Sequence, residues 1–295
     1  QADQDEPSSI YIQSKAIDLS KKSDGHDFYF KEEVFYRSDN LKVFTDQLFV
    51  QTKDMLSESD SLLLQELVYS EANGATYIDH FNYEINCLKM QHYPLEDRLN
   101  VSGSVDFEND FVSIATDRLI VEGNNLSAFK EQQKVRVKIP YSEVFDFNIP
   151  DGDEAQLSNN NGIEDTVIVS DLFELDQLEQ TYACVFHEKV AVDRKDFKLF
   201  SDHLLLNWIR SDESGPDYKL KDVIAEQSVK LIQNEFNASA KKAIIYPENR
   251  LIELVGNAEL IDASGSVSGE RILFDRMSQK TEVLGSSESG KRAKV

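Results

Sequence analysis

The sequence predicts an all-β protein built from two β modules, with one or two short helices inserted. Two observations lead to this fold class. Four ungapped copies of one repeat occur at residues 30–51, 101–122, 186–207 and 256–275, and a recurring pattern of this kind indicates a repetitive architecture. Short apolar strands also follow one another with turn residues between them about every 8 to 12 residues, which is typical of an all-β sandwich or barrel-like roll.

Each repeat contains two apolar runs that are out of phase by one residue. A small apolar residue is followed nine positions later by a larger one, in the pairs Val34 and Val43, Val105 and Ile114, Val190 and Leu199, and Ala258 and Val267. A strand of period two keeps both runs on one face only if an extra residue enters between them. We therefore predict a bulge or sharp corner at the acidic residue of each repeat, with its carboxylate bonding to nearby backbone, at Asp46, Asp117, Asp202 and Glu270.

The repeats group into two larger modules. The first module is predicted over residues 10–148, with an alternating strand over 134–144 that closes it, and the second over 166–295. A Gly-, Asn- and Asp-rich stretch without periodicity predicts a linker at 149–165. Apolar residues at helical spacing predict a helix over 53–71, packed across an open end of the first module.

Two further features of the sequence predict local structure within the modules. A weak helical period runs from Tyr218 to Ile232, although residues 229–238 fit a strand equally well. The pairs Tyr93-Pro94 and Tyr246-Pro247 each stand ten residues before the glycine of a repeat. We expect both pairs to form turns at the same place in their modules.

Composition limits the classes of partner. The chain has 295 residues and a net charge of −23, so it offers no basic stripe for nucleic acid and no attraction to an anionic membrane surface. No run approaches the ~18 apolar residues of a spanning helix. The two cysteines, Cys87 and Cys184, are compatible with a bridge or with two buried free thiols, and the second is favoured. The chain begins at Gln1, so a signal peptide is expected to have been removed or trimmed.

The sequence holds no positive sign of an enzyme. Nucleophile elbows, phosphate loops and zinc-protease motifs are missing, and no metal or cofactor is expected. The five histidines are scattered; His203 is expected to be an exposed strand residue, and the adjacent pair His187 and Glu188 has poor geometry for a dyad. The acidic residues of the repeats occupy equivalent places in four copies, so a turn role is favoured over catalysis.

The C-terminal segment from Ala243 to Val295 resembles the OstA-like (LptA-type) domain of the lipopolysaccharide export machinery. The residues that carry the resemblance are Tyr246, Leu254 with Gly256-Asn257-Ala258, Val267 with Gly269-Glu270 and Ile272, and Gly290-Lys291-Arg292. In the first module Gly103-Ser104-Val105 and Thr116-Asp117 keep the pattern, whereas Glu32 and Glu188 replace the glycine in the other two repeats.

The resemblance implies two twisted, open β-jelly-roll modules whose layers enclose an apolar groove. It implies a non-enzymatic periplasmic protein that binds lipopolysaccharide or a related acylated glycolipid by its acyl chains, works with other lipopolysaccharide-export proteins, and stacks end to end through edge strands, including a last strand at 292–295. The inward parity of the repeats gives the groove candidates, which are Val43, Leu48, Val50, Ile114, Leu119, Val121, Leu199, Leu204, Leu206, Val267, Ile272 and Phe274.

Three alternatives remain open. In the first alternative, the candidate residues fill a closed core rather than a groove, and for most of them this alternative is favoured. In the second alternative, the protein is a structural or interaction scaffold of the envelope that assembles through β-edge contacts without lipid. The third alternative, a carbohydrate-active β-solenoid enzyme, is disfavoured. The repeats of a solenoid would be adjacent in sequence, whereas the repeats of this chain are about 70 to 85 residues apart.

Overall fold

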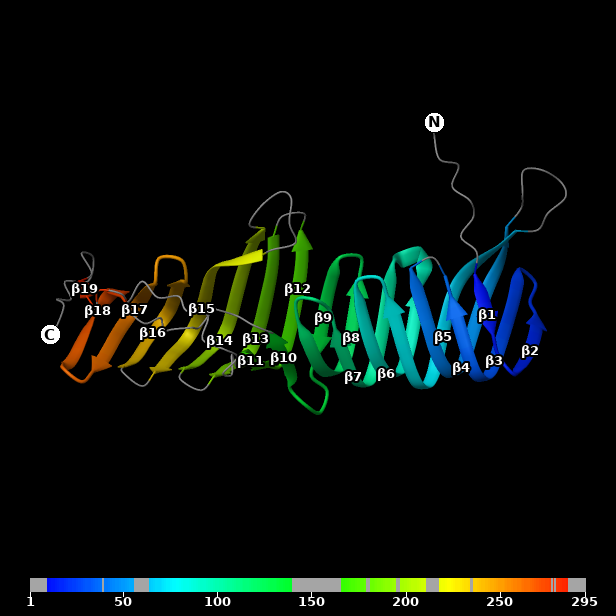
Figure 1. The fold of residues 1–295 in the computed structure, drawn as a ribbon, viewed down its shortest axis with the longest axis horizontal. Coiled ribbons are helices and arrows are strands. Elements are labelled where there is room, and N and C mark those ends of the chain that lie inside the picture. The colour runs from blue at the N-terminus through cyan, green and yellow to red at the C-terminus, as the bar shows by residue number, and fades with distance from the viewer. Residues whose placement is uncertain are drawn as a thin grey trace, which may run out of the picture. The chain divides into compact units, whose positions relative to one another are not determined.

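The structure is a computed structural model that describes residues 10–38, 40–55, 64–139, 166–178, 181–194, 197–210, 218–233, 236–276, 278 and 280–285. Strands dominate the described chain, and its one helical turn is the 3-10 turn η1 (Pro94–Glu96) (Figure 1). The predicted all-β class is confirmed. Within the described residues no helix has the length and apolar character needed to cross a membrane.

Internal contacts divide the chain into a first unit, residues 1–133, and a second unit, residues 134–295. The predicted module limits, 10–148 and 166–295, remain a prediction. The linker predicted at 149–165 lies outside the described residues.

The first unit is an antiparallel meander. Its strands are β1 (Tyr11–Gln13), β2 (Ala16–Lys21), β3 (Gly25–Arg37), β4 (Leu41–Met55), β5 (Leu64–His80), β6 (Tyr83–Tyr93), β7 (Arg98–Glu108), β8 (Ser113–Glu122) and β9 (Asn125–Phe129). From β3 to β9 each strand pairs with the next, while β1 and β2 both pair with β3. The two partners of β3 occupy its two ends, because β3 is interrupted by a bulge between them.

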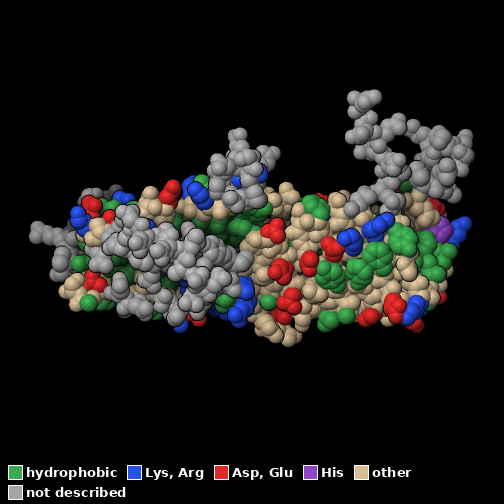
Figure 2. Space-filling model, in the orientation of Figure 1, with side chains coloured by type: hydrophobic (Ala, Val, Ile, Leu, Met, Phe, Trp, Pro, Cys, Tyr) green, Lys and Arg blue, Asp and Glu red, His purple; other side chains and the backbone are tan. Residues whose placement is uncertain are grey.

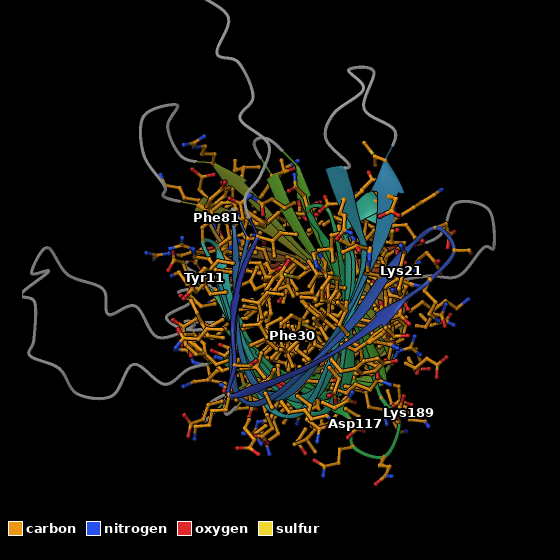
Figure 3. All side chains as sticks on the ribbon, turned by 90° about the vertical axis from the view of Figure 1, so that its right-hand side faces the viewer. Tyr11, Lys21, Phe30, Phe81, Asp117 and Lys189 are labelled. Atoms are coloured by element: carbon orange, nitrogen blue, oxygen red, sulfur yellow. The ribbon has the colours of Figure 1, made fainter. Side chains whose placement is uncertain are left out.

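The bulges divide the first unit into two layers. Layer A contains β1 and segments 34–37, 41–45, 76–80, 83–86, 105–108 and 113–116, and layer B contains β2, β9 and segments 25–31, 47–55, 64–73, 89–93, 98–102 and 118–122. Figure 3 looks at the N-terminal end of this unit and shows two layers of strands that meet along one edge, with Phe30 between them. The core therefore lies between the layers.

The predicted corners are confirmed, and the structure shows how they are built. Each acidic residue of a repeat lies opposite two residues of the preceding strand, so the extra residue belongs to the partner strand. Both bulge residues have positive φ, in the pairs Glu32 and Glu33, Gly103 and Ser104, Glu188 and Lys189, and Gly256 and Asn257. Two successive left-handed residues redirect the strand and move it from one layer to the other.

The second unit repeats this plan. Its strands are β10 (Val135–Ile139), β11 (Thr166–Ser170), β12 (Leu172–Leu178), β13 (Thr181–Arg194), β14 (Phe197–Arg210), β15 (Tyr218–Gln233), β16 (Phe236–Tyr246), β17 (Leu251–Asp262), β18 (Gly265–Asp275) and β19 (Lys280–Leu284). β11 and β12 pair with the two ends of β13, as β1 and β2 do with β3, and the strands from β13 to β19 form a meander. Of the alternating strand expected over 134–144, residues 135–139 form β10, which pairs with β11, and residues 140–144 lie outside the described residues.

The helix predictions are wrong for the described residues. The helix over 53–71 is replaced at its two ends by β4 and β5, which pair from Thr52 with Leu67 to Met55 with Leu64, and residues 56–63 lie outside the described chain. The stretch from Tyr218 to Ile232 belongs to the long strand β15. Pairing with neighbouring strands supplies backbone partners for each segment, and this tertiary pairing overrides the helical spacing of the leucines.

Two smaller predictions are confirmed. Both Tyr-Pro pairs form the same turn, in which the amide of Asp97 donates to Pro94 O and that of Arg250 to Pro247 O, each at 3.2 Å. Cys87 and Cys184 are buried free thiols. Burial raises the pKa of Cys87 to about 12 and also raises that of Cys184, so both remain protonated at neutral pH.

Candidate functional site

The predicted groove residues lie on the inner side of the two units, and most of them are core. Nine are buried, namely Val43, Leu48, Val50, Ile114, Leu119, Leu199, Leu204, Leu206 and Ile272. The other three, Val121, Val267 and Phe274, are half-buried. The structure therefore brings six candidates together inside each unit.

Cross-strand register joins the candidates of the first unit into two apolar bands that run across the strands. The band in layer A is Tyr36, Val43, Ile78, Ile85, Phe107 and Ile114, and all six side chains are buried. One band in layer B is Phe30, Leu48, Ala72, Met90, Val101, Leu119 and Ala128, again buried throughout. Sequence reasoning found the members on β4 and β8. It missed those on β3 and β7, the partner strands within each repeat, and those on β5, β6 and β9, which lie outside the repeats.

A second band of layer B contains a polar break. Val50 pairs with Ser70, which pairs with His92, and His92 pairs with Leu99. Ser70 Oγ and His92 Nδ1 are buried without a hydrogen-bond partner. Burial lowers the pKa of His92 to about 4, against a smaller opposing effect of the Asp97 carboxylate.

The second unit has no such break at the equivalent positions. Its corresponding band runs from Leu206 through Val223, Ile245 and Ile252 to Phe274. A parallel band of Phe186, Leu204, Ala225, Ala243, Leu254 and Ile272 is buried throughout. The interior of the second unit is thus a continuous apolar surface over these strands.

The interior of the first unit is exposed at its N-terminal end. Ile17 and Leu19 on β2 pair with Phe30 and Phe28, and opposite residues of an antiparallel pair point to the same face. Ile17 is nevertheless 56% exposed and Leu19 61% exposed, because β2 has no strand on its other side among those described. The end view in Figure 3 looks onto this open end. The alternation of Ile17 and Leu19 in the sequence indicates a strand with one apolar face, but it does not indicate that this strand lies at the end of the sheet.

The second unit also exposes inward residues at its last described strands. β19 covers β18 only from Arg271 to Asp275, so Val267 lies on a segment without a further partner strand in the described chain. Phe274 remains half-buried although its ring centroid lies 5.2 Å from that of Phe236. The two least buried candidates of this unit are therefore at its end.

The described residues contain no group of three or more His, Cys, Asp or Glu side chains able to hold a metal ion. His187 does not pair with its neighbour Glu188; its Nε2 lies 2.9 Å from Glu174 Oε2. Its ring packs on that of His203, with centroids 4.9 Å apart, so His203 is half-buried rather than exposed. This row lies at the corner of the outer face, away from the apolar bands.

Comparison with known proteins gives one family match. The family described as LptA/(LptD N-terminal domain) LPS transport protein matches residues 167–280. A search of curated proteins gives no match. Among solved structures, LptH of Pseudomonas aeruginosa, described as the LptA homologous periplasmic component of the lipopolysaccharide transport device, is 17% identical, with a TM-score of 0.35 over 44% of this chain and 92% of that one.

The family match confirms the resemblance seen in the C-terminal segment and extends it toward the start of the second unit. It spans β11 to β18 and includes both bulged repeats of that unit. Residues 167–280 are therefore similar to the LptA/(LptD N-terminal domain) family.

Proposed function

We propose that this chain is a non-enzymatic periplasmic protein of lipopolysaccharide transport, which binds the acyl chains of lipopolysaccharide or a related acylated glycolipid between its β layers and passes them toward the outer membrane. The observation that carries the proposal is the family match over residues 167–280. The apolar bands inside each unit support it, since they offer aliphatic and aromatic surface and few polar groups.

Burial of chain methylenes drives binding in this proposal. Each methylene removed from water contributes about 0.8 kcal/mol, and the ligand undergoes no covalent change. The nine buried candidates lie in a packed core, so the layers must part to admit chains. Entry begins where inward side chains already reach solvent, at Ile17 and Leu19 in the first unit and at Val267 and Phe274 in the second. Sugars and phosphates remain outside.

Edge strands supply the contacts to partners. β1 and β2 pair with β3 and have no strand on the other side among those described. A strand from another lipopolysaccharide-export protein, or from a second copy, can add to this edge by backbone hydrogen bonds. The exposed Ile17 and Leu19 would be covered in the same step, so the apolar interiors of stacked protomers become continuous.

A scaffold that assembles through these edges without lipid is the second candidate. The burial of Val43, Leu119, Ile272 and the other core candidates favours it, because a filled core needs no ligand. The two candidates differ in whether the purified protein carries lipid.

The test is lipid extraction and mass spectrometry of the full chain purified from a cell that makes lipopolysaccharide, followed by titration with fluorescent lipopolysaccharide. We expect a bound acylated glycolipid, and Leu19→Asp at the open end to weaken binding at least about tenfold. Ile232→Asp is the matched control, because Ile232 is 44% exposed on an outer face. If no acylated lipid is extracted, and L19D binds lipopolysaccharide as the wild type does, the interior role is wrong.

A further inference from the structure

The first unit carries a pocket on its outer surface that the lipid proposal does not use. The pocket has a volume of about 570 Å³, which is in the range of small-ligand and side-chain sites. It lies over the corner where layers A and B meet, and its lining includes the exposed side chains of Glu33, Phe44, Asp46, Asn86 and Leu88.

The floor of this corner pocket is aromatic and aliphatic. The rings of Phe35, Phe44 and Tyr77 form a row across β3, β4 and β5, with centroids 4.9 Å and 6.0 Å apart. Phe44 is 45% exposed and Leu88 56% exposed. Large apolar side chains that gather on an outer face mark an interaction site more often than isolated ones do.

The rim of the corner pocket is acidic. Glu33 and Asp46 line it, and Asp106 pairs in register with the lining residue Asn86. Glu84 and Glu108 lie directly opposite each other on the same face, an arrangement that repels. In the part of the chain that the structure describes, no Lys or Arg forms an ion pair with Asp46, Asp106 or Glu108. Figure 2 shows a group of hydrophobic side chains on the visible face of the first unit, with acidic and basic side chains beside it.

The same corner of the second unit has the opposite chemistry. Lys189 occupies the bulge position of Glu33, Lys230 pairs with Phe200 as Tyr77 pairs with Phe44, and Lys241 stands against Gly256 as Leu88 stands against Gly103. Three equivalent positions are thus basic in one unit and acidic or apolar in the other. The shared fold tolerates lysine there, so neither the apolar floor nor Glu33 is required by the bulge.

We propose that the corner pocket docks a basic, apolar segment of a partner protein. An apolar side chain of the segment packs on Phe44 and Leu88, and neighbouring Lys or Arg side chains lay their aliphatic stems over the aromatic row and place their charges at Asp46 and Asp106. Asp46 and Asp106 then gain the cations that they lack within the described chain, whereas Glu33 already pairs with Lys15. This docking takes place on the outer face and is independent of lipid in the interior.

The probe is a short fluorescent peptide of alternating Arg and Leu, measured by anisotropy with the full chain at near-physiological salt. A peptide with Ser in place of Leu has the same charge and controls for attraction to the net charge of −23. Leu88→Lys places in the first unit the residue that the second unit has. Phe200→Lys is the matched variant, because it changes the net charge equally and also replaces an exposed side chain, 39% exposed in the second unit.

We expect the Arg-Leu peptide to bind more tightly than the Arg-Ser peptide. Leu88→Lys should weaken its binding about tenfold or more, Asp46→Asn about threefold, and Phe200→Lys less than twofold. Equal binding of both peptides, or equal losses in L88K and F200K, would show attraction to net charge alone and overturn the proposal. Self-association of the free chain that L88K abolishes, without peptide binding by the wild type, would also overturn it by assigning the pocket to a second copy.

Discussion

At the residue scale, Asp117 shows what the acidic position of a repeat does. Its Oδ2 accepts backbone hydrogen bonds from Glu131, Gln132 and Gln133 at 3.2, 2.7 and 2.8 Å. These donors stabilise the charged form, so the pKa of the carboxyl falls below its ordinary value. The expected bonding of the carboxylate to backbone is confirmed here, but the turn that it closes lies at residues 131–133 rather than at its own corner.

The pH dependence of this contact has a definite sign. The folded pKa is depressed, so the contribution of Asp117 to stability is present above the unfolded pKa and is lost as pH falls through the folded one. We predict that Asp117→Ala lowers the melting temperature at pH 7, and that the difference from the wild type narrows below about pH 4. Melting curves from pH 7 to pH 3 measure this; a difference that is constant with pH would contradict it.

The pKa of His92 is also lowered in the folded state, but for a different reason: burial disfavours its charged form, whereas hydrogen bonds favour the charged form of Asp117. The folded pKa of His92, about 4, lies below the ordinary value for histidine, so the unfolded chain binds more protons between these values. Stability from this residue is therefore complete above about pH 6.5 and is lost as pH falls toward 4.

We predict that His92→Ile, which copies Ile245 of the second unit, removes a pH-dependent loss on the order of 2 kcal/mol between pH 7 and pH 4.5. Urea unfolding at both pH values gives the free energies. The variant should also be at least as stable as the wild type at pH 7, because a buried Nδ1 without a partner is removed. Equal pH dependence in the two proteins would show that His92 is not the group responsible.

At the scale of the strand, the bulge is the element that makes the fold. Gly256 has φ +80°, and a Cβ there would lie 3.0 Å from Cβ and Cδ of Lys241. We predict that Gly256→Ala lowers the free energy of unfolding by about 1 to 3 kcal/mol. The matched control is Glu188→Ala, which changes a bulge position with φ 61° that already carries a side chain and should cost less than about 1 kcal/mol. Similar losses in both variants would refute the role of the glycine.

The sequence predicted the strands with bulges better than the rest, for a physical reason. The phase change around Asp46 and Asp117 can be read from single strands, because burial on either side of a corner follows local alternation. The pairing of β4 with β5 cannot be read this way, since Leu64 and Leu67 fit a helix as well as a strand until their partners are known. Interior positions were predicted on the same basis, whereas the open end at Ile17 and Leu19 depends on which strand is last in the sheet, a property of the whole unit.

At the scale of the whole molecule, the position of β10 decides where the second unit can be cut. β10 pairs with β11 over five residues, from Val135 with Ser170 to Ile139 with Thr166, and Val135, Val137 and Ile139 are buried. Internal contacts place β10 in the second unit, while the sequence assigns it to the first module. A fragment that begins at residue 149 leaves the edge of β11 uncovered and loses these three side chains.

We predict that a fragment of residues 134–295 unfolds cooperatively and is more stable than one of residues 149–295 by several kcal/mol. Full burial of a Val or Ile side chain contributes about 1.5 to 3 kcal/mol, and the total stability of a domain is only about 5 to 15 kcal/mol. The shorter fragment should also aggregate more readily through the free edge of β11. Circular dichroism melts and sedimentation of the two fragments compare them. Equal stability and solubility would place β10 with the first module, and the limit of the second unit would then lie after residue 148.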